Sequence, residues 1–247
     1  MNILIPMAGL GDRFKKEGYD KPKPLIDVMG EPMIRRALDS LPLYGRCIFV
    51  INKNIEQIEE LKSILNEYQD DDGGNLVIIE IDYLTEGPAS TCLLAKEYIN
   101  NGPLLIANCD QIMEWDNEDF LEYITINSIV RKCYDGIVVT YPANTEKNSY
   151  VKLNDDGNAI EFAEKKVISE HSLNGIHYWK NGLDFVNSAE RMIQKNIRVN
   201  NEFYIAPTYN EMILDGKRIG IYPIESNEHW AVGTPEDLKK YLEHASV

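Results

Sequence analysis

The sequence predicts an α/β protein whose Rossmann-like, doubly wound and mostly parallel mixed sheet is flanked by helices. In the first half of the chain, short apolar runs alternate with segments of helical spacing, which is the β-α-β rhythm of such a sheet. In the second half, several short strands follow one another across turns before further helices. No linker, repeat or low-complexity segment divides the 247 residues. We therefore expect a single domain over residues 1–247.

Four strands and three helices are expected in the first half. The strands are short apolar runs bounded by turn residues, namely Ile3–Met7, Arg46–Ile51, Leu76–Tyr83 and Leu104–Ala107. The helices are Pro32–Leu41, with proline in its first turn, Ile55–Tyr68, and Ser90–Tyr98. Apolar residues of the middle helix recur at helical spacing and form one face. The run of three aspartates and two glycines at 70–74 lacks the spacing of a calcium loop and predicts a solvated turn.

The second half is expected to supply five strands and three helices. The strands are Gly136–Tyr141, Ser149–Leu153, Ala159–Ala163, Gly175–Trp179 and Ile219–Pro223. A hairpin turn over Asn154–Gly157 joins the second of these strands to the third. The helices are Gly182–Lys195, Pro207–Leu214 and Pro235–His244.

Charge and hydropathy exclude several classes of partner. With 25 basic and 40 acidic residues the net charge is −15, and such a surface disfavours nucleic acid, whose phosphates need a broad basic face. No apolar run approaches about 18 residues, so no membrane span is expected. The first apolar run, Ile3–Met7, is expected to be a strand and not a signal peptide. We expect a cytoplasmic protein without membrane or nucleic-acid partners, with a homodimer as the default assembly.

Cysteine and histidine spacing argues against zinc. Cys47, Cys92, Cys109 and Cys133 are dispersed and form no C-x-x-C pair. They are expected to be buried thiols in a reducing compartment. The four histidines are equally scattered.

The first 25 residues indicate phosphate binding. The run Ile3–Met7 leads into Ala8, two glycines separated by Leu10, and then Asp12, Arg13 and Phe14. Glycines let the backbone approach a ligand, and successive N–H groups form an anion cradle. Cations gather beside this cradle in an otherwise acidic chain: Arg13, Lys15, Lys16, Lys21 and Lys23. A triphosphate or pyrophosphate group is the ligand that these cations favour. The alternative interpretation is that the lysines are solvated loop residues that bind no ligand.

Two common phosphate motifs are absent. The dinucleotide fingerprint fails because Phe14 stands where its third glycine belongs. The Walker pattern fails for want of Gly-Lys followed by Ser or Thr.

A series of motifs along nearly the whole chain resembles the bacterial (sugar-)phosphate nucleotidyltransferase family. The series begins with Gly-x-Gly-x-Arg-Phe after the first strand. It continues through Pro22–Leu25, Glu86–Ala89, Asn108–Gln111, Glu164-Lys165, Asn174–Ile176 and Trp230–Leu238. The chain is most similar to cytidylyltransferases from capsule loci.

The resemblance implies a reaction and a division of the chain. A nucleoside monophosphate, CTP being the favoured donor, would pass to a phosphorylated small molecule, with Mg²⁺ as cofactor and pyrophosphate as product. The acceptor would be a sugar 1-phosphate, a phosphocholine-like ester, or a capsule precursor such as phosphoglutamine. About residues 1–115 would bind the NTP, and about 116–247 the acceptor.

The resemblance also implies the nucleotide site. The nucleotide-binding residues would be Met7, Ala8, Gly9, Leu10, Gly11, Asp12, Arg13, Lys23, Thr85, Glu86, Gly87, Ala89 and Asn108. Of these, the segment around Gly87 would let a flat base approach the backbone, although a plain turn capped by Ser90 explains it equally. Arg13, Lys23 and Asp110 would be catalytic.

Asp110 is the expected metal ligand. It follows the strand Leu104–Ala107 at its C-terminal end, where open α/β sheets bind ligands. Mg²⁺ prefers one or two carboxylates together with phosphate oxygens and waters. A helix N-cap or a loop aspartate is the structural alternative.

The acceptor site implied by the resemblance is less complete. Its residues would be Gln111, Glu164, Lys165, Asn174, Gly175, Tyr204 and Trp230, with Glu202 as a further candidate. Glu164 would bind acceptor hydroxyls and Lys165 the acceptor phosphate. Two departures from the family occur: Lys166 stands where proline is usual, and no alanine separates Asn174 from Gly175.

Ala231 is the largest departure, because many sugar-phosphate members carry a second metal-binding aspartate there. Either Asp110 alone holds a single Mg²⁺ with waters and phosphates, or Glu225 or Glu228 substitutes, or activity is weakened.

Two other classes of protein stay open. One is a GT-A-type glycosyltransferase, whose metal motif Asn108–Asp110 faintly resembles. The other is a non-catalytic NTP-binding module.

Overall fold

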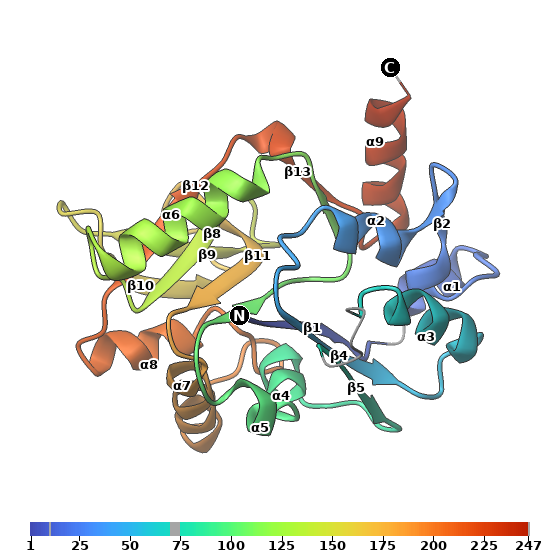
Figure 1. Cartoon of the computed structure of the whole chain (residues 1–247). Coiled ribbons are helices and arrows are strands. Elements are labelled where there is room, and N and C mark those ends of the chain that lie inside the picture. Colours follow the sequence, from blue (N-terminus) through green and yellow to red (C-terminus); the bar gives the residue numbers. More distant parts are fainter. Residues whose placement is uncertain (10, 70–74, 247) are drawn as a thin grey trace.

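One nine-stranded sheet takes strands from both halves of the chain in the computed structural model, which describes residues 1–9, 11–69 and 75–246. Its order runs β10-β9-β11-β6-β1-β4-β5, with β8 paired to β11 and β12 (Figure 1). The fold class predicted from the sequence is confirmed: a mixed, mostly parallel sheet lies between helices.

The parallel part of the sheet comes from the first half. β1 (Asn2–Met7) lies between β4 (Arg46–Asn52) and β6 (Leu104–Ile106), and β5 (Leu76–Ile81) extends the sheet beyond β4. All three pairings are parallel. The carboxyl ends of β1 and β6 therefore lie at one edge, where the chain continues into the glycine turn and toward Asp110.

Antiparallel pairing begins at β11 (His171–Trp179). This strand runs against β6, β8 (Gly136–Pro142) and β9 (Ser149–Leu153). β10 (Ala159–Glu164) is antiparallel to β9, and β12 (Ile219–Pro223) is parallel to β8. Because β11 runs opposite to β6, its N-terminal part lies beside the carboxyl ends of the parallel strands.

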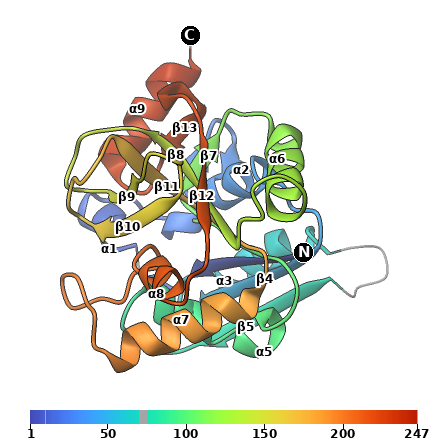
Figure 2. The same ribbon diagram turned by 90° about the vertical axis from the view of Figure 1, so that its left-hand side faces the viewer.

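Helices cover both faces of the sheet (Figures 1 and 2). One apolar cluster joins Ile3 and Ile5 of β1 to helices α2 (Met33–Asp39), α3 (Ile58–Asn66) and α6 (Asn117–Ile129). The other joins Leu4 to α4 (Pro88–Leu93), α5 (Lys96–Ile99), α7 (Gly182–Gln194) and α8 (Thr208–Leu214). Alternate residues of β1 thus enter opposite cores, as period-2 side chains of a central strand must.

Smaller elements surround the ends of the strands. Helix α9 (Pro235–Ala245) packs Leu238 and Tyr241 against Phe14 of α1 (Asp12–Lys16). Two short ribbons, β2 (Asp27–Val28) with β3 (Glu31–Pro32) and β7 (Gln111–Met113) with β13 (His229–Ala231), lie outside the main sheet. Single 3₁₀ turns cover Lys23–Leu25 and Ser226–Glu228.

The structure corrects several predicted elements. The helix expected over Ser90–Tyr98 is two short helices, and it begins at Pro88 with Gly87 as its N-cap, so Ser90 is not the cap. Helix α6 was not predicted from the sequence, because apolar residues lie all around it and mark no single face. The strands β7 and β13 are three residues long and carry too little pattern to be recognised. The turn expected at 70–74 lies outside the described residues.

The structure also tests the predictions about buried cysteines and membrane-spanning segments. Cys47 and Cys92 are buried and Cys109 is half-buried, but Cys133 is exposed, so the expectation of four buried thiols is wrong there. Cys133 follows the end of α6 at a φ of 52°, in a turn where no core covers it. None of the helices formed by the described residues has the length and apolarity needed to cross a membrane.

Candidate functional site

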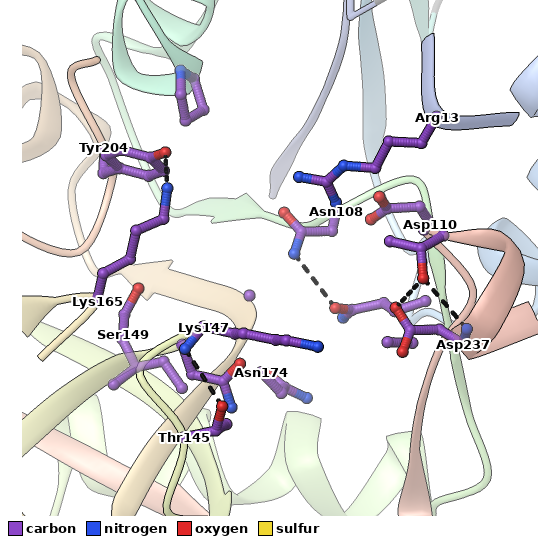
Figure 3. Close-up of a pocket in the computed structure, with 18 of the residues that line it drawn as sticks. Arg13, Asn108, Asp110, Thr145, Lys147, Ser149, Lys165, Asn174, Tyr204 and Asp237 are labelled. Carbon is purple, nitrogen blue, oxygen red and sulfur yellow. Dashed lines mark hydrogen bonds between the residues drawn. The ribbon is translucent and has the colours of Figure 1, made fainter. Parts of the chain in front are cut away.

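A cavity of about 1420 Å³ opens at the carboxyl ends of β1 and β6 and is lined by residues from both halves of the chain. Small-ligand sites usually measure about 300–1000 Å³, so this cavity has room for two substrates. In Figure 3, Arg13, Asn108, Asp110 and Asp237 lie toward one side of it, and Lys165 and Tyr204 toward the other.

The glycine turn brings two cations to the first side. β1 ends at Met7, and Gly11, at a φ of 68°, precedes the short helix α1. A Cβ on Gly11 would lie 2.9 Å from the Cβ of Lys23, so only glycine admits Lys23 this closely. Arg13 extends from α1 into the cavity (Figure 3) and forms no salt bridge with any residue described. The turn thus holds Lys23 near the strand ends and leaves Arg13 free for a ligand.

Lys23 and Asp110 form an ion pair and hydrogen bond in this cavity, with 20% and 30% of their side chains exposed. Burial alone would lower the pKa of Lys23, but the Asp110 carboxylate outweighs it and raises that pKa. Burial would likewise raise the pKa of Asp110, and the Lys23 ammonium instead holds it below its usual range. Both groups are therefore charged at neutral pH. A Cβ on Gly233 would come within 2.5 Å of the Asp110 carboxylate, so the backbone approaches it closely.

The donors around Asp110 fit a metal that keeps most of its water. No three His, Cys, Asp or Glu residues in the described part of the chain gather into a metal-binding group. Glu225 and Glu228 instead cap each other in the 3₁₀ turn and do not line the cavity, so neither replaces the carboxylate missing at Ala231. Mg²⁺ is commonly held by one carboxylate, phosphates and waters, and Asp110 meets that requirement.

The side-chain carboxamides of Asn108, Gln111 and Asn174 line the cavity between its two sides, and we call them the carboxamide floor. The amide nitrogen of Asn108 donates to Gln111 over 3.4 Å, and the amide nitrogen of Asn174 reaches the Met113 sulfur at 3.5 Å. Gln111 and Asn174 are only 2% and 4% exposed, yet both line the cavity. A thioether is a weak acceptor, so the Asn174 amide retains donor capacity for a ligand oxygen. Gly175, at a φ of 94°, lies where any Cβ would collide with the Asn108 amide.

The second side carries a chain of polar contacts from the antiparallel strands. Lys165 donates to the Tyr204 hydroxyl, and that hydroxyl donates to Glu202. The Lys165 ammonium also lies 4.5 Å from the centre of the Tyr204 ring. Glu164 accepts a hydrogen bond from Ser149, and burial raises the pKa of Glu164. Lys165 has a φ of 53°, a turn conformation, and both Glu164 and Lys165 line the cavity.

Several cavity residues were not predicted from the sequence. Among them are Thr145, Lys147, His177, His229 and Asp237. Lys147 forms no salt bridge with any described residue, and Figure 3 shows it extending into the cavity. His177 is 5% exposed, and burial lowers its pKa to about 3, so it is neutral. Lone loop lysines and strand histidines carry no local signal, and only the fold brings them here.

Other predicted residues do not line the cavity. Met7, Ala8 and Ala89 are buried in the apolar cores. Trp230 points away because alternate residues of β13 face opposite sides, and it stacks on His244 with ring centres 4.0 Å apart. Gly9 is exposed outside the cavity lining. Leu10 lies outside the described residues.

The loop 85–89, which we call the base loop, reaches the cavity lining through Pro88 alone. A Cβ on Gly87 would lie 2.5 Å from the backbone nitrogen of Phe203, so this glycine is required by a close backbone approach. Thr85 donates to the Gly87 carbonyl, and Glu86 is exposed and paired with Arg198. The close approach of Phe203 is therefore one reason for a glycine at position 87, and the approach of a base to this loop stays a prediction.

The family model described as the MobA-like NTP transferase domain matches residues 3–146. The chain belongs to this family of NTP transferases.

Some curated relatives are similar to 80% or more of the chain. Bifunctional protein GlmU of Methanocaldococcus jannaschii is 26% identical, covering 98% of this chain and 54% of that protein. A probable mannose-1-phosphate guanylyltransferase 1 of Oryza sativa is 27% identical, over 80% of this chain and 55% of that protein. The chain thus spans about half the length of the curated relatives it matches.

Solved structures support the fold. A nucleoside-diphosphate-sugar pyrophosphorylase from Vibrio cholerae superposes with a TM-score of 0.83 at 23% identity, covering 98% of this chain and 99% of that one. An inositol-1-phosphate CTP transferase from T. maritima gives 0.71 at 13% identity, over 99% and 94% of the two chains. At such identities the likeness establishes the shared fold alone.

Proposed function

We propose that this member of the MobA-like NTP transferase family transfers a nucleoside monophosphate from an NTP to a phosphorylated small molecule and releases pyrophosphate. One observation carries the proposal: Arg13, Lys23, Lys147 and Lys165 line one cavity that also contains the Asp110 carboxylate. Lys16 lines the cavity as well, and five cations around a space for two ligands suit two phosphorylated substrates. About residues 1–115 would bind the NTP and about 116–247 the acceptor.

The reaction needs no side-chain nucleophile. A phosphate monoester carries a charge of about −1.5 to −2 at pH 7, so its oxygen can attack without a general base. That oxygen forms a bond to the α-phosphorus of the NTP, while the bond from this phosphorus to the β-phosphate oxygen breaks and pyrophosphate leaves with its electrons. The protein has to align two anions that repel each other and stabilise the charge that develops.

The cavity residues divide this work between them. Arg13, whose planar fork suits paired phosphate oxygens, would bind the β- and γ-phosphates. Lys23, held beside the strand ends, would contact the phosphates nearest the α-position. Lys165, with Lys147 nearby in the lining, would bind the acceptor phosphate. In the absence of substrate, Lys23 pairs with Asp110 and Lys165 with Tyr204, so both ammonium groups are already oriented.

Asp110 would be the protein ligand of Mg²⁺. When bound there, the ion would neutralise charge on the α- and β-phosphate oxygens and restrict their orientation. The ion pair with Lys23 keeps the Asp110 carboxylate deprotonated and ready to coordinate.

CTP is the donor we favour, and the acceptor is a sugar 1-phosphate or a capsule precursor such as phosphoglutamine. The support for CTP is the resemblance of the motif order to capsule-locus cytidylyltransferases and the name of one similar structure, an inositol-1-phosphate CTP transferase. The support for a sugar 1-phosphate is the name of a similar protein, a mannose-1-phosphate guanylyltransferase. The carboxamide floor adds donors and acceptors for hydroxyl or amide groups on such an acceptor. The product would serve capsule or surface polysaccharide synthesis.

Pyrophosphate release tests the proposal directly. The protein and Mg²⁺ are incubated with CTP, UTP, GTP, dTTP or ATP, each crossed with sugar 1-phosphates, phosphocholine and phosphoglutamine. Release that depends on one NTP and one acceptor supports the proposal and identifies both substrates. Release of a nucleoside diphosphate from a nucleotide sugar would instead identify a glycosyltransferase. NTP binding without turnover of any pair would indicate a non-catalytic module and contradict the proposal.

A further inference from the structure

Residues 198–204, between α7 and α8, touch both groups of candidate substrate-binding residues, and we call them the connecting segment. Val199 and Glu202 exchange backbone hydrogen bonds of 3.1 and 3.0 Å across a tight turn. The two central residues, Asn200 and Asn201, have φ angles of 49° and 65°. Asparagine tolerates this left-handed conformation well, so the segment is a defined hairpin.

One side of the connecting segment is bonded to the base loop. The Phe203 N–H donates to the Glu86 carbonyl over 2.8 Å, and the Ala89 N–H donates to the Phe203 carbonyl over 2.9 Å. Phe203 is fully buried in a small apolar cluster with Ala89. The base loop and the segment therefore move as one unit unless these contacts break.

The other side of the connecting segment faces the acceptor part of the cavity. Glu202 and Tyr204 flank Phe203 in sequence and point the opposite way, into the cavity lining. The Tyr204 hydroxyl links Lys165 to Glu202 through the two hydrogen bonds described above. A shift of the base loop can thus reach the acceptor-binding side chains through the backbone of Phe203.

Arg198 links the base loop to the connecting segment from outside the cavity. One terminal nitrogen donates to the Glu86 carboxylate over 2.8 Å, and the other donates to the Asn201 carbonyl over 3.2 Å. Its guanidinium carbon lies 3.9 Å from the centre of the Phe203 ring. Arg198 does not line the cavity, so it acts on substrates only through the residues it holds.

We propose that Arg198 is a positioning residue that couples occupation of the nucleotide site to the conformation of the acceptor-binding side chains. This inference rests on the proposed function. The Arg198–Glu86 pair has exposed fractions of 28% and 63%, and exposed pairs add little to global stability. The Arg198–Glu86 pair therefore affects mainly the position of the base loop relative to the connecting segment. Coupling between two binding sites is reciprocal, so an acceptor bound at Tyr204 also strengthens nucleotide binding.

Amide hydrogen exchange with CTP and Mg²⁺, without acceptor, tests the coupling. In the wild-type protein, CTP slows exchange in the base loop and also in residues 202–205. In Arg198→Gln, base-loop protection remains, while the protection transmitted to 202–205 falls about fivefold. Glu86→Gln has the same effect. Protection of residues 202–205 falls no further in the double variant, because both substitutions remove the same Arg198–Glu86 interaction. Arg198→Lys restores little, since an ammonium cannot span the carboxylate, carbonyl and ring together.

Arg35→Gln is the matched control. Arg35 has 27% of its side chain exposed and pairs with Glu67 over 2.5 Å, but neither residue lines the cavity. This variant should transmit protection like the wild type. Full transmission in Arg198→Gln would overturn the proposal, and so would failure of CTP, UTP, GTP and ATP alike to protect 202–205 in the wild type. Coupling without pyrophosphate release under any substrate pair would retain the inference and reject the proposed function.

Discussion

The two sides of the cavity are built differently. On the proposed nucleotide side, Asp110 follows the end of the parallel strand β6, and Lys23 begins the 3₁₀ turn that lies against Gly11. On the proposed acceptor side, Lys165 follows the end of β10 and Tyr204 lies in the connecting segment, 39 residues away in the chain. Asn210 of α8 forms hydrogen bonds to the backbone of Phe162 in β10 and so holds the two regions together. The first side depends on the parallel pairing of β1 with β6, whereas the second depends on the packing of α8 and the connecting segment against β10. Substitutions should therefore separate phosphate chemistry on one side from acceptor binding on the other.

The largest effect is expected for Lys23→Ala. Loss of a cation that contacts the reacting phosphates should lower kcat by about 10²–10³-fold, with a much smaller effect on folding because the Lys23–Asp110 pair is partly solvated. Steady-state pyrophosphate release and thermal unfolding measure the two effects. Lys15→Ala is the control, since Lys15 is exposed and pairs with Glu56. Normal turnover by Lys23→Ala would remove Lys23 from the mechanism.

Lys165→Met should chiefly weaken acceptor binding. Removing one charge-assisted contact to a phosphate costs about 1.5–3 kcal/mol, so KM for the acceptor should rise by about 10–100-fold. Nucleotide affinity, measured by calorimetry with CTP, should stay within about twofold. Lys166→Met is the neighbouring control on an exposed side chain. An equal loss of nucleotide affinity would show that the two sides are not separable in this way.

Gly175→Ala tests the junction between the sides. Both Gly175 and Gly157 have positive φ, but only at Gly175 would a Cβ collide with a neighbour, the Asn108 amide. Gly157→Ala therefore measures backbone strain alone, about 1 kcal/mol. Gly175→Ala should cost about 1–3 kcal/mol more because of crowding. Urea denaturation of both variants gives the difference, and equal losses would contradict the close approach.

The smallest effect concerns acid stability. Burial lowers the pKa of His177 from about 6.5 to about 3, so the folded state binds fewer protons here than the unfolded state. Stability from this group is complete above pH 6.5 and is lost as pH falls toward 3, by about 1.4 kcal/mol per pH unit. Urea denaturation at pH 7.5 and 5.5 should show a shallower pH dependence in His177→Phe than in the wild type. Parallel curves for the two proteins would exclude His177 as the cause.

The sequence alone determined the fold class, and it predicted part of the cavity lining. The alternation of apolar runs and helical segments predicted the sheet because buried strands and amphipathic helices leave strong periodic signals. Gly11 after β1 and Asp110 after β6 both line the cavity, as their places at strand ends predicted. The motif order correctly indicated an NTP transferase family.

Tertiary structure decided what has no local signal. Lys147, His177 and Asp237 reach the cavity only because antiparallel strands and α9 fold against the parallel half. Trp230 leaves the cavity because the pairing of β13 with β7 fixes which face each residue takes. The narrow space at Gly87 comes from Phe203, 116 residues away in the chain. Contacts of such sequence separation depend on packing and register, and these are properties of the whole fold rather than of any segment.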